Sequence, residues 1–360
     1  MKFAFFGSSL VSAYWNGAAT YYRGLIRQLH LRGHEVTFYE PDAFERQQHR
    51  DLDDPDWARV VVYPAHDEQG VRAALREAAD ADVIIKNSGV GIFDALLEAA
   101  VLDLRAPART VIFWDVDAPA TLDRLRTHAD DPLRRHIPDY DLVLTYGGGT
   151  PVVRGYEQEF HARRCVPIYN ALDPETHFPV DPEPRFEADL SFLGNRLPDR
   201  EARVAAFFFS AAHEGLRHRF LLGGNGWQDH PLPDNVRYVG HVYTRDHNAF
   251  NCSARAVLNI SRESMVRCGY SPATRLFEAA GAGACLITDA WEGIEQFLAP
   301  GEEVLVAHSG EEVVGLLDEL SPERAERIGT NALARVTREH TYARRAAELE
   351  AVLEGRDLPA

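Results

Sequence analysis

The sequence contains few cysteines and almost no lysine. Its 360 residues include four cysteines, and none of them forms a Cys-x-x-Cys pair. A zinc site or a disulfide framework therefore has little support, and buried or inert thiols are the expectation. Lys2 and Lys86 are the only lysines, so phosphate contacts would fall to arginine, whose planar guanidinium binds phosphate through two N–H groups.

Long apolar runs and excess positive charge are also missing. No run approaches the roughly 20 apolar residues of a transmembrane helix, and the N-terminus enters a strand-like segment at residues 2–6 without a signal peptide. The net charge of −17 argues against a general nucleic-acid or anionic-membrane surface. We therefore expect a cytoplasmic protein with no nucleic-acid partner and no integral membrane association.

Length and pattern together predict two α/β domains, because 360 residues exceed one ordinary core. Strands are expected at residues 2–6, 35–39, 60–63, 83–86, 110–114, 142–145, 188–193, 219–222, 236–239, 256–260, 284–288 and 303–307. Helices are expected at residues 18–32, 70–79, 93–102, 200–210, 247–253, 273–280, 294–298, 310–320, 322–339 and 342–353. This repeated strand–helix rhythm is typical of doubly wound parallel sheets.

Polar residues follow several strands of the first half. Gly7, Ser8, Asn16 and Asn87 come at or soon after strand ends, where ligands of open α/β sheets gather. The glycines lack the full GxGxxG spacing, so no dinucleotide fingerprint is present. These residues are candidates for a binding cleft, and tight-turn chemistry is the alternative.

The pair Asp115-x-Asp117 follows the strand at 110–114. Such a pair can hold a divalent metal that bridges a nucleotide diphosphate. It can also supply a carboxylate that binds acceptor hydroxyls or acts as a base, or it can cap a loop. We take Asp117 as the first candidate base and Asp115 as the second; His66, in the loop after the strand at 60–63, is a weaker one.

The stretch from Cys268 to Asp289 reads as a loop, a helix and a buried strand. Ser271 is expected as the N-cap, with Pro272 at the first helical position. The open helix N-terminus would then form an anion site. Arg275 lies on the same helix face as Glu278, three residues later, which suits a nucleotide diphosphate or, alternatively, a plain surface pair.

The block Gly-Tyr-Ser-Pro followed by Arg-Leu-Phe-Glu-Ala-Ala-Gly-Ala-Gly, at 269–283, resembles the donor-binding signature of GT-B glycosyltransferases. It is similar to the "glycosyl transferases group 1" type of spore-maturation-protein-like (CgeB-like) enzymes. The stretch 166–179 also resembles the segment that follows the first domain in family-4-like glycosyltransferases. Many relatives carry a further Glu eight residues before the position of Glu278, where this chain has Tyr270.

The resemblance implies two Rossmann-like domains that face each other across a cleft. Residues 1–169 would form an acceptor domain, 170–187 a hinge, 188–339 a donor domain, and 340–360 a helix that crosses back to the first domain. It implies that Glu278 contacts the ribose of the donor. The donor-binding residues expected on this basis are Arg196, His241, Arg262, Ser271, Thr274, Arg275 and Glu278.

The implied function is transfer of a sugar from a nucleotide-diphosphate sugar to an unidentified acceptor, a small molecule, glycan or protein. No cofactor and no metal are expected, because a helix N-terminus and arginines would stabilise the diphosphate. Two alternatives remain open: a nucleotide-sugar 2-epimerase on the same fold, and a non-catalytic nucleotide-sugar binding protein.

Overall fold

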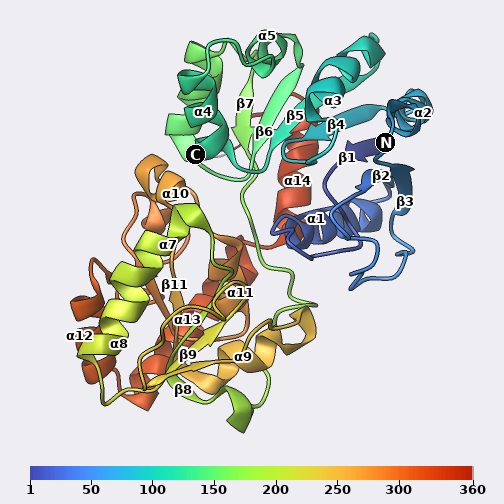
Figure 1. Cartoon of the computed structure of the whole chain (residues 1–360). Coiled ribbons are helices and arrows are strands. Elements are labelled where there is room, and N and C mark those ends of the chain that lie inside the picture. The colour runs from blue at the N-terminus through green and yellow to red at the C-terminus, as the bar shows by residue number, and fades with distance from the viewer. Residues whose placement is uncertain (359–360) are drawn as a thin grey trace. The chain divides into compact units, whose positions relative to one another are not determined.

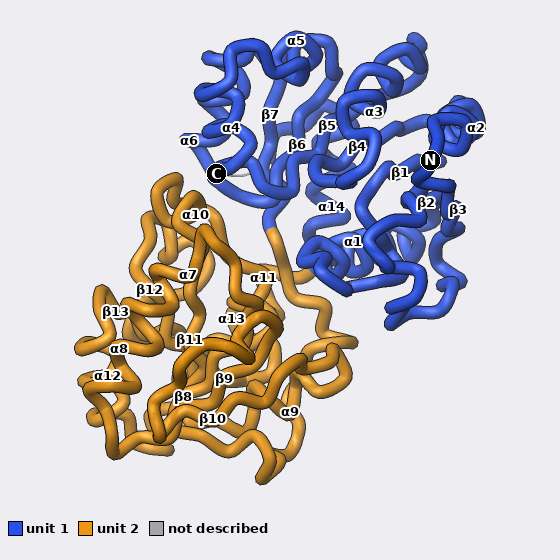
Figure 2. Tube along the Cα trace, viewed as in Figure 1, with its two compact units in different colours: residues 1–169, 342–360 blue, residues 170–341 orange. Residues whose placement is uncertain are grey.

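The computed structural model describes residues 1–358, and these form two compact units (Figures 1 and 2). Unit 1 comprises Met1–Tyr169 together with the C-terminal segment that begins at Tyr342, and unit 2 comprises Asn170–Thr341. Each unit is an α/β domain with its own parallel sheet.

Unit 1 is built on a seven-stranded sheet with the order β3-β2-β1-β4-β5-β6-β7, in which all recorded neighbours are parallel. The strands are β1 (Lys2–Phe6), β2 (Glu35–Asp42), β3 (Arg59–Pro64), β4 (Val83–Asn87), β5 (Thr110–Asp115), β6 (Leu142–Thr145) and β7 (Cys165–Pro167). The central strands are apolar runs buried on both faces, as parallel sheets covered by helices require. The strand order reverses between β1 and β4, and ligands of such sheets bind at the carboxyl ends of the strands there.

The helices of unit 1 are α1 (Ala19–Leu31), α2 (Glu68–Ala78), α3 (Asp94–Ala100), α4 (Ala118–Thr127), α5 (Leu133–His136), α6 (Gly149–Arg154) and α14 (Tyr342–Leu353). The C-terminal helix α14 packs against α1. Gly24 makes this contact close: a Cβ atom there would lie 2.1 Å from the Tyr342 ring. Glu350 adds an ion pair with Arg32 and a contact of 2.7 Å to His34 Nε2.

Unit 2 repeats the arrangement with a six-stranded sheet of order β10-β9-β8-β11-β12-β13. The strands are β8 (Ala188–Leu193), β9 (Phe220–Gly223), β10 (Val236–Tyr238), β11 (Ala254–Asn259), β12 (Leu286–Asp289) and β13 (Leu305–Ala307). The helices are α7 (Pro198–Val204), α8 (Ser210–Glu214), α9 (His247–Ser253), α10 (Glu263–Cys268), α11 (Thr274–Gly281), α12 (Gly310–Glu319) and α13 (Pro322–Glu339). The strand order reverses between β8 and β11, which marks the equivalent binding position of this unit.

Several predicted elements have other bounds. The helix expected at 200–210 begins at Pro198 and continues to Glu214, with a π-helical segment at Ala205–Phe209 between α7 and α8. The helix expected at 294–298 is a single 3-10 turn, Ile294–Gln296. Five elements were not predicted: β7 and the helices α4, α5, α6 and α10. β7, α5, α6 and α10 have three to six residues, too few for a period to show in the sequence. The ten-residue α4 was missed although it is as long as α12, which was predicted.

The prediction that Ser271 caps the helix at 273–280 is wrong. The helix α11 begins at Thr274 and its N-cap is Ala273, in extended conformation and without a side-chain cap. The Ser271 hydroxyl instead donates to the carbonyl of Gly269 at 2.9 Å. Pro272 therefore precedes the N-cap instead of occupying the first helical position. No described helix is both long and apolar enough to cross a membrane.

Replacement of Gly24 by alanine tests the packing of α14 on α1. Alanine favours a helix over glycine by up to about 1 kcal/mol, but the added methyl group would collide with the Tyr342 ring, and overpacking costs about 1–3 kcal/mol. We expect Gly24→Ala to lower Tm. Gly315→Ala is the matched control, because that helical glycine has open space around its Cβ position; its Tm should stay equal or rise. Equal Tm changes in the two variants would contradict the close contact.

Candidate functional site

The carboxyl edge of the unit 2 sheet gathers the loops that follow β8, β9 and β11. The loops after β8 and β9 fit closely: a Cβ atom on Gly224, which has φ +116°, would lie 2.3 Å from the carbonyl oxygen of Gly194. The same carbonyl accepts a hydrogen bond from Trp227 Nε1 at 2.8 Å. Glycine at position 224 is therefore required both by the backbone angle and by the close approach.

Arginine side chains converge on this edge, each held by a carboxylate. Arg196 pairs with Glu201. Arg262, which forms the N-cap of α10, pairs with Asp199. Further pairs join Arg275 Nη1 to Glu278 Oε2 at 3.2 Å and Arg203 Nη2 to Asp289 Oδ2 at 2.9 Å. The structure thus brings together several of the predicted donor-binding arginines.

Arg200, on the first turn of α7, lies at the centre of this group and was not among the predicted site residues. Its Nη2 donates to the carbonyl of Asn195 at 2.6 Å, while its Nε is buried without a hydrogen-bond partner among the described residues. The pKa of Arg200 is lowered to about 10. Burial is the largest cause, and the charges of Arg275 and Arg262 add to it. Arg200 lies four residues after Arg196, on the turn from strand to helix. This spacing is the sequence signal that could have identified Arg200 as a site residue.

A buried carboxylate fixes the loop that carries Arg262. Asp289, at the end of β12, is fully buried and accepts hydrogen bonds from the backbone N–H and the hydroxyl of Ser261 at 3.0 and 3.1 Å. Arg203 donates to the same carboxylate through Nε and Nη2. Burial raises the pKa of Asp289, and the Arg203 charge opposes that rise. This network joins α7, β11 and β12 at the strand ends.

The start of α11 is anchored to the segment that precedes β8. Thr274 Oγ1 donates to Asn170 Oδ1 at 3.2 Å, and Asn170 Nδ2 donates to the carbonyl of Pro272 at 3.2 Å. The predicted donor residues Ser271 and Thr274 therefore shape the entry to α11. His241, after β10, is exposed, and its Nδ1 lies 3.3 Å from Asn225 Nδ2.

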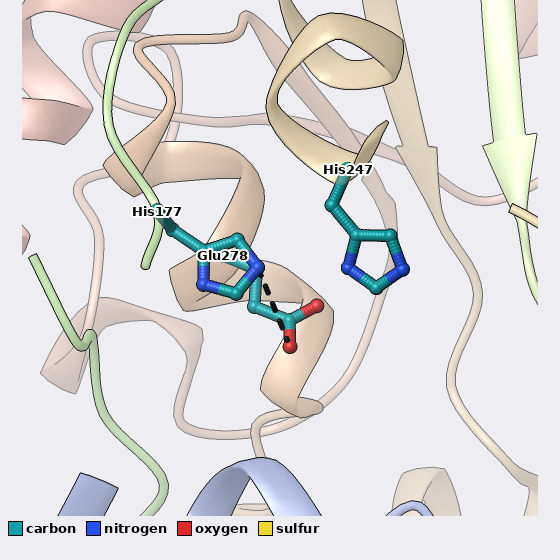
Figure 3. A group of neighbouring side chains, drawn as sticks. All are labelled: His177, His247 and Glu278. Carbon is teal, nitrogen blue, oxygen red and sulfur yellow. Dashed lines mark ion pairs between the residues drawn. The ribbon is translucent and has the colours of Figure 1, made fainter. Parts of the chain in front are cut away.

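Glu278, predicted to contact a ribose, lies almost buried on α11 with 5% of its surface exposed. One oxygen faces Arg275, and the other lies 3.9 Å from His177 Nε2. His247 completes the group (Figure 3). The ribose contact of Glu278 stays a prediction. Neither histidine was predicted here, because positions 177, 247 and 278 are far apart in the sequence.

The polar residues at the carboxyl edge of the unit 1 sheet hold its loops. Ser8 Oγ donates to Asn16 Oδ1 at 2.9 Å, Asn16 Nδ2 donates to two backbone carbonyls, and Asn87 Nδ2 donates to the Phe6 carbonyl at 3.0 Å. All three side chains are buried. A Cβ atom on Gly7 would collide with the Phe38 ring at 2.4 Å. These contacts favour turn and loop chemistry over direct ligand binding for these four predicted cleft residues.

Asp115 and Asp117 differ strongly in environment. The carboxylate of Asp115 is fully buried and accepts from the Ser88 and Thr121 hydroxyls, the Asp117 N–H and the Tyr156 hydroxyl. These donors occupy both oxygens, which disfavours a metal or proton-transfer role for Asp115. Asp117 is the half-buried N-cap of α4 and stays the predicted base. The other candidate base, His66, is exposed beside Asp67.

The chain is similar to a known protein family in sequence and to solved structures in fold. The sequence model of a family described as "Glycosyl transferase-like" matches residues 200–351. No match is found among curated proteins. HepE from Anabaena, solved in complex with UDP and glucose, is 14% identical with a TM-score of 0.68, over 99% of this chain and 100% of that chain.

Two further solved structures are similar over almost the whole chain. Sucrose-phosphate synthase from Thermosynechococcus elongatus is 14% identical with a TM-score of 0.71, over 99% of this chain and 98% of that one. An α-glucosyltransferase in complex with UDP is 12% identical with a TM-score of 0.70, over 98% of this chain and 99% of that one.

The predicted fold, two Rossmann-like domains of the GT-B type, is confirmed over the whole chain. The family match over residues 200–351 covers most of unit 2, where the arginine-rich edge lies. This part of the chain is thus similar in sequence to a glycosyl transferase-like family, and the chain is similar in fold to GT-B glycosyltransferases.

Replacement of Asp289 by asparagine tests the network at the strand ends. Asparagine keeps the shape but removes the charge that balances Arg203 and one of the acceptors that Ser261 uses. Breaking a buried, hydrogen-bonded pair of this kind costs about 2–4 kcal/mol, so we expect Asp289→Asn to lower the denaturant midpoint clearly. Glu263→Gln removes the exposed partner of Arg203 and should change stability by less than about 0.5 kcal/mol. A neutral Asp289→Asn variant would disprove the role given to this network.

Proposed function

We propose that the protein transfers a sugar from a nucleoside-diphosphate sugar to an acceptor, and that the carboxyl edge of the unit 2 sheet binds the donor. The observation that carries the proposal is the convergence of Arg200, Arg262 and Arg275. Burial contributes most to the lowered pKa of Arg200, and the charges of Arg275 and Arg262 lower it further. Three guanidinium groups that interact in this way form a site for a multiply charged anion. A diphosphate supplies that charge and accepts the paired N–H groups that arginine offers.

The same arginines give the site its chemistry. Departure of the nucleoside diphosphate places negative charge on the leaving oxygen, and prearranged donors in a partly buried site stabilise that charge as it develops. The first turn of α11 adds backbone N–H groups and the positive end of its dipole beside Arg275. Because this charge is supplied by the protein, the transfer needs no metal at the diphosphate.

The remaining donor contacts follow from the neighbouring residues. Glu278 accepts the ribose hydroxyls and holds Arg275, His241 packs beside the base, and Asp117 of unit 1 serves as the base in an inverting reaction. HepE and the α-glucosyltransferase were solved with UDP, so UDP and UDP-glucose are the first donor probes. The acceptor binds unit 1.

The function is tested with the full-length chain in two steps. A thermal-shift panel of nucleoside diphosphates and their sugars identifies the donor, because a ligand that binds the folded state raises Tm. Release of nucleoside diphosphate from that donor is then measured with a panel of glycans and small-molecule acceptors. Conversion of the donor to an epimer without acceptor would instead indicate an epimerase, and binding without turnover on any acceptor would indicate a binding protein.

Substitution of Arg200 tests the diphosphate site. Arg200→Met keeps the length of the side chain but removes a charged donor, and hydrogen bonds to charged groups contribute about 1.5–3 kcal/mol. We expect the Kd for UDP to rise about 10- to 100-fold and the Kd for uridine to change less than about threefold. Arg217→Met is the control, because Arg217 is an exposed arginine of the same unit paired with Asp318. Equal losses for UDP and uridine would refute the assignment.

Addition of divalent ions tests whether the transfer reaction needs a metal ion at the diphosphate. Since guanidinium groups already neutralise the leaving group, Mg²⁺ or Mn²⁺ should leave the initial rate within about twofold of the rate without them. The measurement is the initial rate of UDP release at saturating donor. A tenfold stimulation by either ion would show that a metal shares the diphosphate.

A further inference from the structure

Three side chains from separate segments of unit 2 meet in its interior (Figure 3). His177 comes from the segment before β8, His247 is the first residue of α9, and Glu278 lies on α11. One potential ligand atom from each lies within 4.8 Å of the other two, and among the described residues no second group of three His, Cys, Asp or Glu is arranged in this way. His177 is 2% exposed and Glu278 5%.

The hydrogen-bond network assigns the tautomer of His177. The hydroxyl of Thr176 donates its single proton to the Asp173 carbonyl at 3.2 Å, and the same oxygen lies 2.9 Å from His177 Nδ1. When the Thr176 proton is on the Asp173 carbonyl, Nδ1 carries the ring proton and donates it to Thr176, and Nε2 is then an acceptor. This Nε2 is buried without a hydrogen-bond partner among the described residues. It faces the carboxylate of Glu278 at 3.9 Å, a separation too long for a hydrogen bond.

His247 presents the same chemistry from the other side. Its Nδ1 is also buried without a hydrogen-bond partner among the described residues, and the ring interacts with the backbone of Val242. Burial, and after it the nearby charge of Arg275, lowers the pKa of His247 to about 3. The imidazole is therefore neutral at neutral pH, with Nδ1 free to act as an acceptor when the other nitrogen donates to Val242.

Two imidazole nitrogens and one carboxylate oxygen thus lie close together, and neither nitrogen has a hydrogen-bond partner among the described residues. A buried acceptor left without a partner costs about 1–3 kcal/mol. A single water could donate to only two of the three atoms, whereas a cation satisfies all three. The center of a triangle with sides of 4.8 Å lies about 2.8 Å from each corner, so small side-chain movements would reach the 2.0–2.2 Å typical of zinc bonds.

We propose that His177, His247 and Glu278 form a binding site for one divalent transition-metal ion of the zinc class. Two neutral imidazoles and a carboxylate are ligands that such ions prefer. The contacts of His177 with Thr176 and of His247 with Val242 supply the outer hydrogen bonds that orient metal-bound histidines. The ion would join the segment before β8, α9 and α11, and so stabilise unit 2.

Arg275 acts on this site in two opposite ways. Its guanidinium lies 3.2 Å from Glu278 Oε2 and repels a cation, which weakens binding. Burial and, after it, the same charge lower the pKa of His247, which favours the neutral imidazole that metal binding uses. The metal would use the Glu278 oxygen that faces the histidines. The other oxygen, beside Arg275, has a second lone pair for the ribose hydroxyl of the proposed donor.

The test is a metal titration of the untagged full-length chain after dialysis against a chelator, without nucleotide. Calorimetry with Zn²⁺ should give one ion per chain, and Co²⁺ should give the visible absorption of a four- or five-coordinate site. Saturating Zn²⁺ should raise Tm on the order of 5–10 °C, and Mg²⁺, which prefers six oxygen ligands, should give no shift.

Substitutions locate the ion. The double variant His177→Ala/His247→Ala should weaken Zn²⁺ binding more than about 100-fold. Glu278→Gln, which keeps the side-chain volume, should weaken it more than about 10-fold and guards against loss of folding in the double variant. His308→Ala, at an exposed histidine of the same unit, should leave binding unchanged. Absence of stoichiometric binding, or binding that the double variant retains, would overturn the proposal.

The proposed metal site and the proposed donor site can be disproved independently of each other. Metal binding is measured without nucleotide, and donor binding is measured with UDP in the Arg200 variant, whose substitution leaves the three proposed ligands in place. A chain that binds Zn²⁺ but no nucleoside diphosphate would retain this inference and lose the proposed function. The reverse result would retain the proposed function alone.

Discussion

Repulsion among the arginines gathered at the carboxyl edge of the unit 2 sheet is the constraint on which the organisation of that edge depends. Guanidinium groups that share this edge repel one another, so each needs a counter-charge when no ligand is bound. Arg196, Arg262 and Arg275 have Glu201, Asp199 and Glu278 for this purpose. Arg200 is the exception, since it donates to a backbone carbonyl. These arginines are oriented by their partners without a ligand, so an anion that bound at this edge would meet donors that are already in place.

The parallel sheet explains why these side chains meet at all. Every recorded strand pair of both sheets is parallel, so the loops after the carboxyl ends share one edge. In unit 2, Asp289 links the ends of β11 and β12 to α7 through Ser261 and Arg203. In unit 1, Asp115 has the corresponding position as the last residue of β5 and also accepts hydrogen bonds on both oxygens. In both units a buried carboxylate at a strand end therefore fixes the geometry of the neighbouring loops. Side chains that could contact a ligand lie on those loops, not at the buried carboxylate.

The sequence predicted elements where local signals agree. The bounds of β1, α13 and α14 were predicted to the residue, because an apolar run, the Ser-Pro start of α13 and regular apolar spacing mark them. Ser-Pro at 271–272 failed as the same signal, because Ser271 bonds back to Gly269 and the chain stays extended until Ala273. Arginines at the carboxyl edge of the unit 2 sheet were predicted from motifs. Arg200 and the His177–His247–Glu278 group were not, since only the tertiary fold brings these residues to their partners.

Tyr270 shows how the chain departs locally from the pattern that it resembles. Its backbone has φ 49°, which is strained for a side chain other than glycine. The strain is compensated by a hydrogen bond of 2.6 Å from its N–H to the Glu292 carbonyl and by one of 3.0 Å from its hydroxyl to the Glu292 carboxylate. Gly293 is needed beneath the ring, because a Cβ there would lie 2.3 Å from it. The Tyr270 hydroxyl thus holds the carboxylate of Glu292 beside this loop.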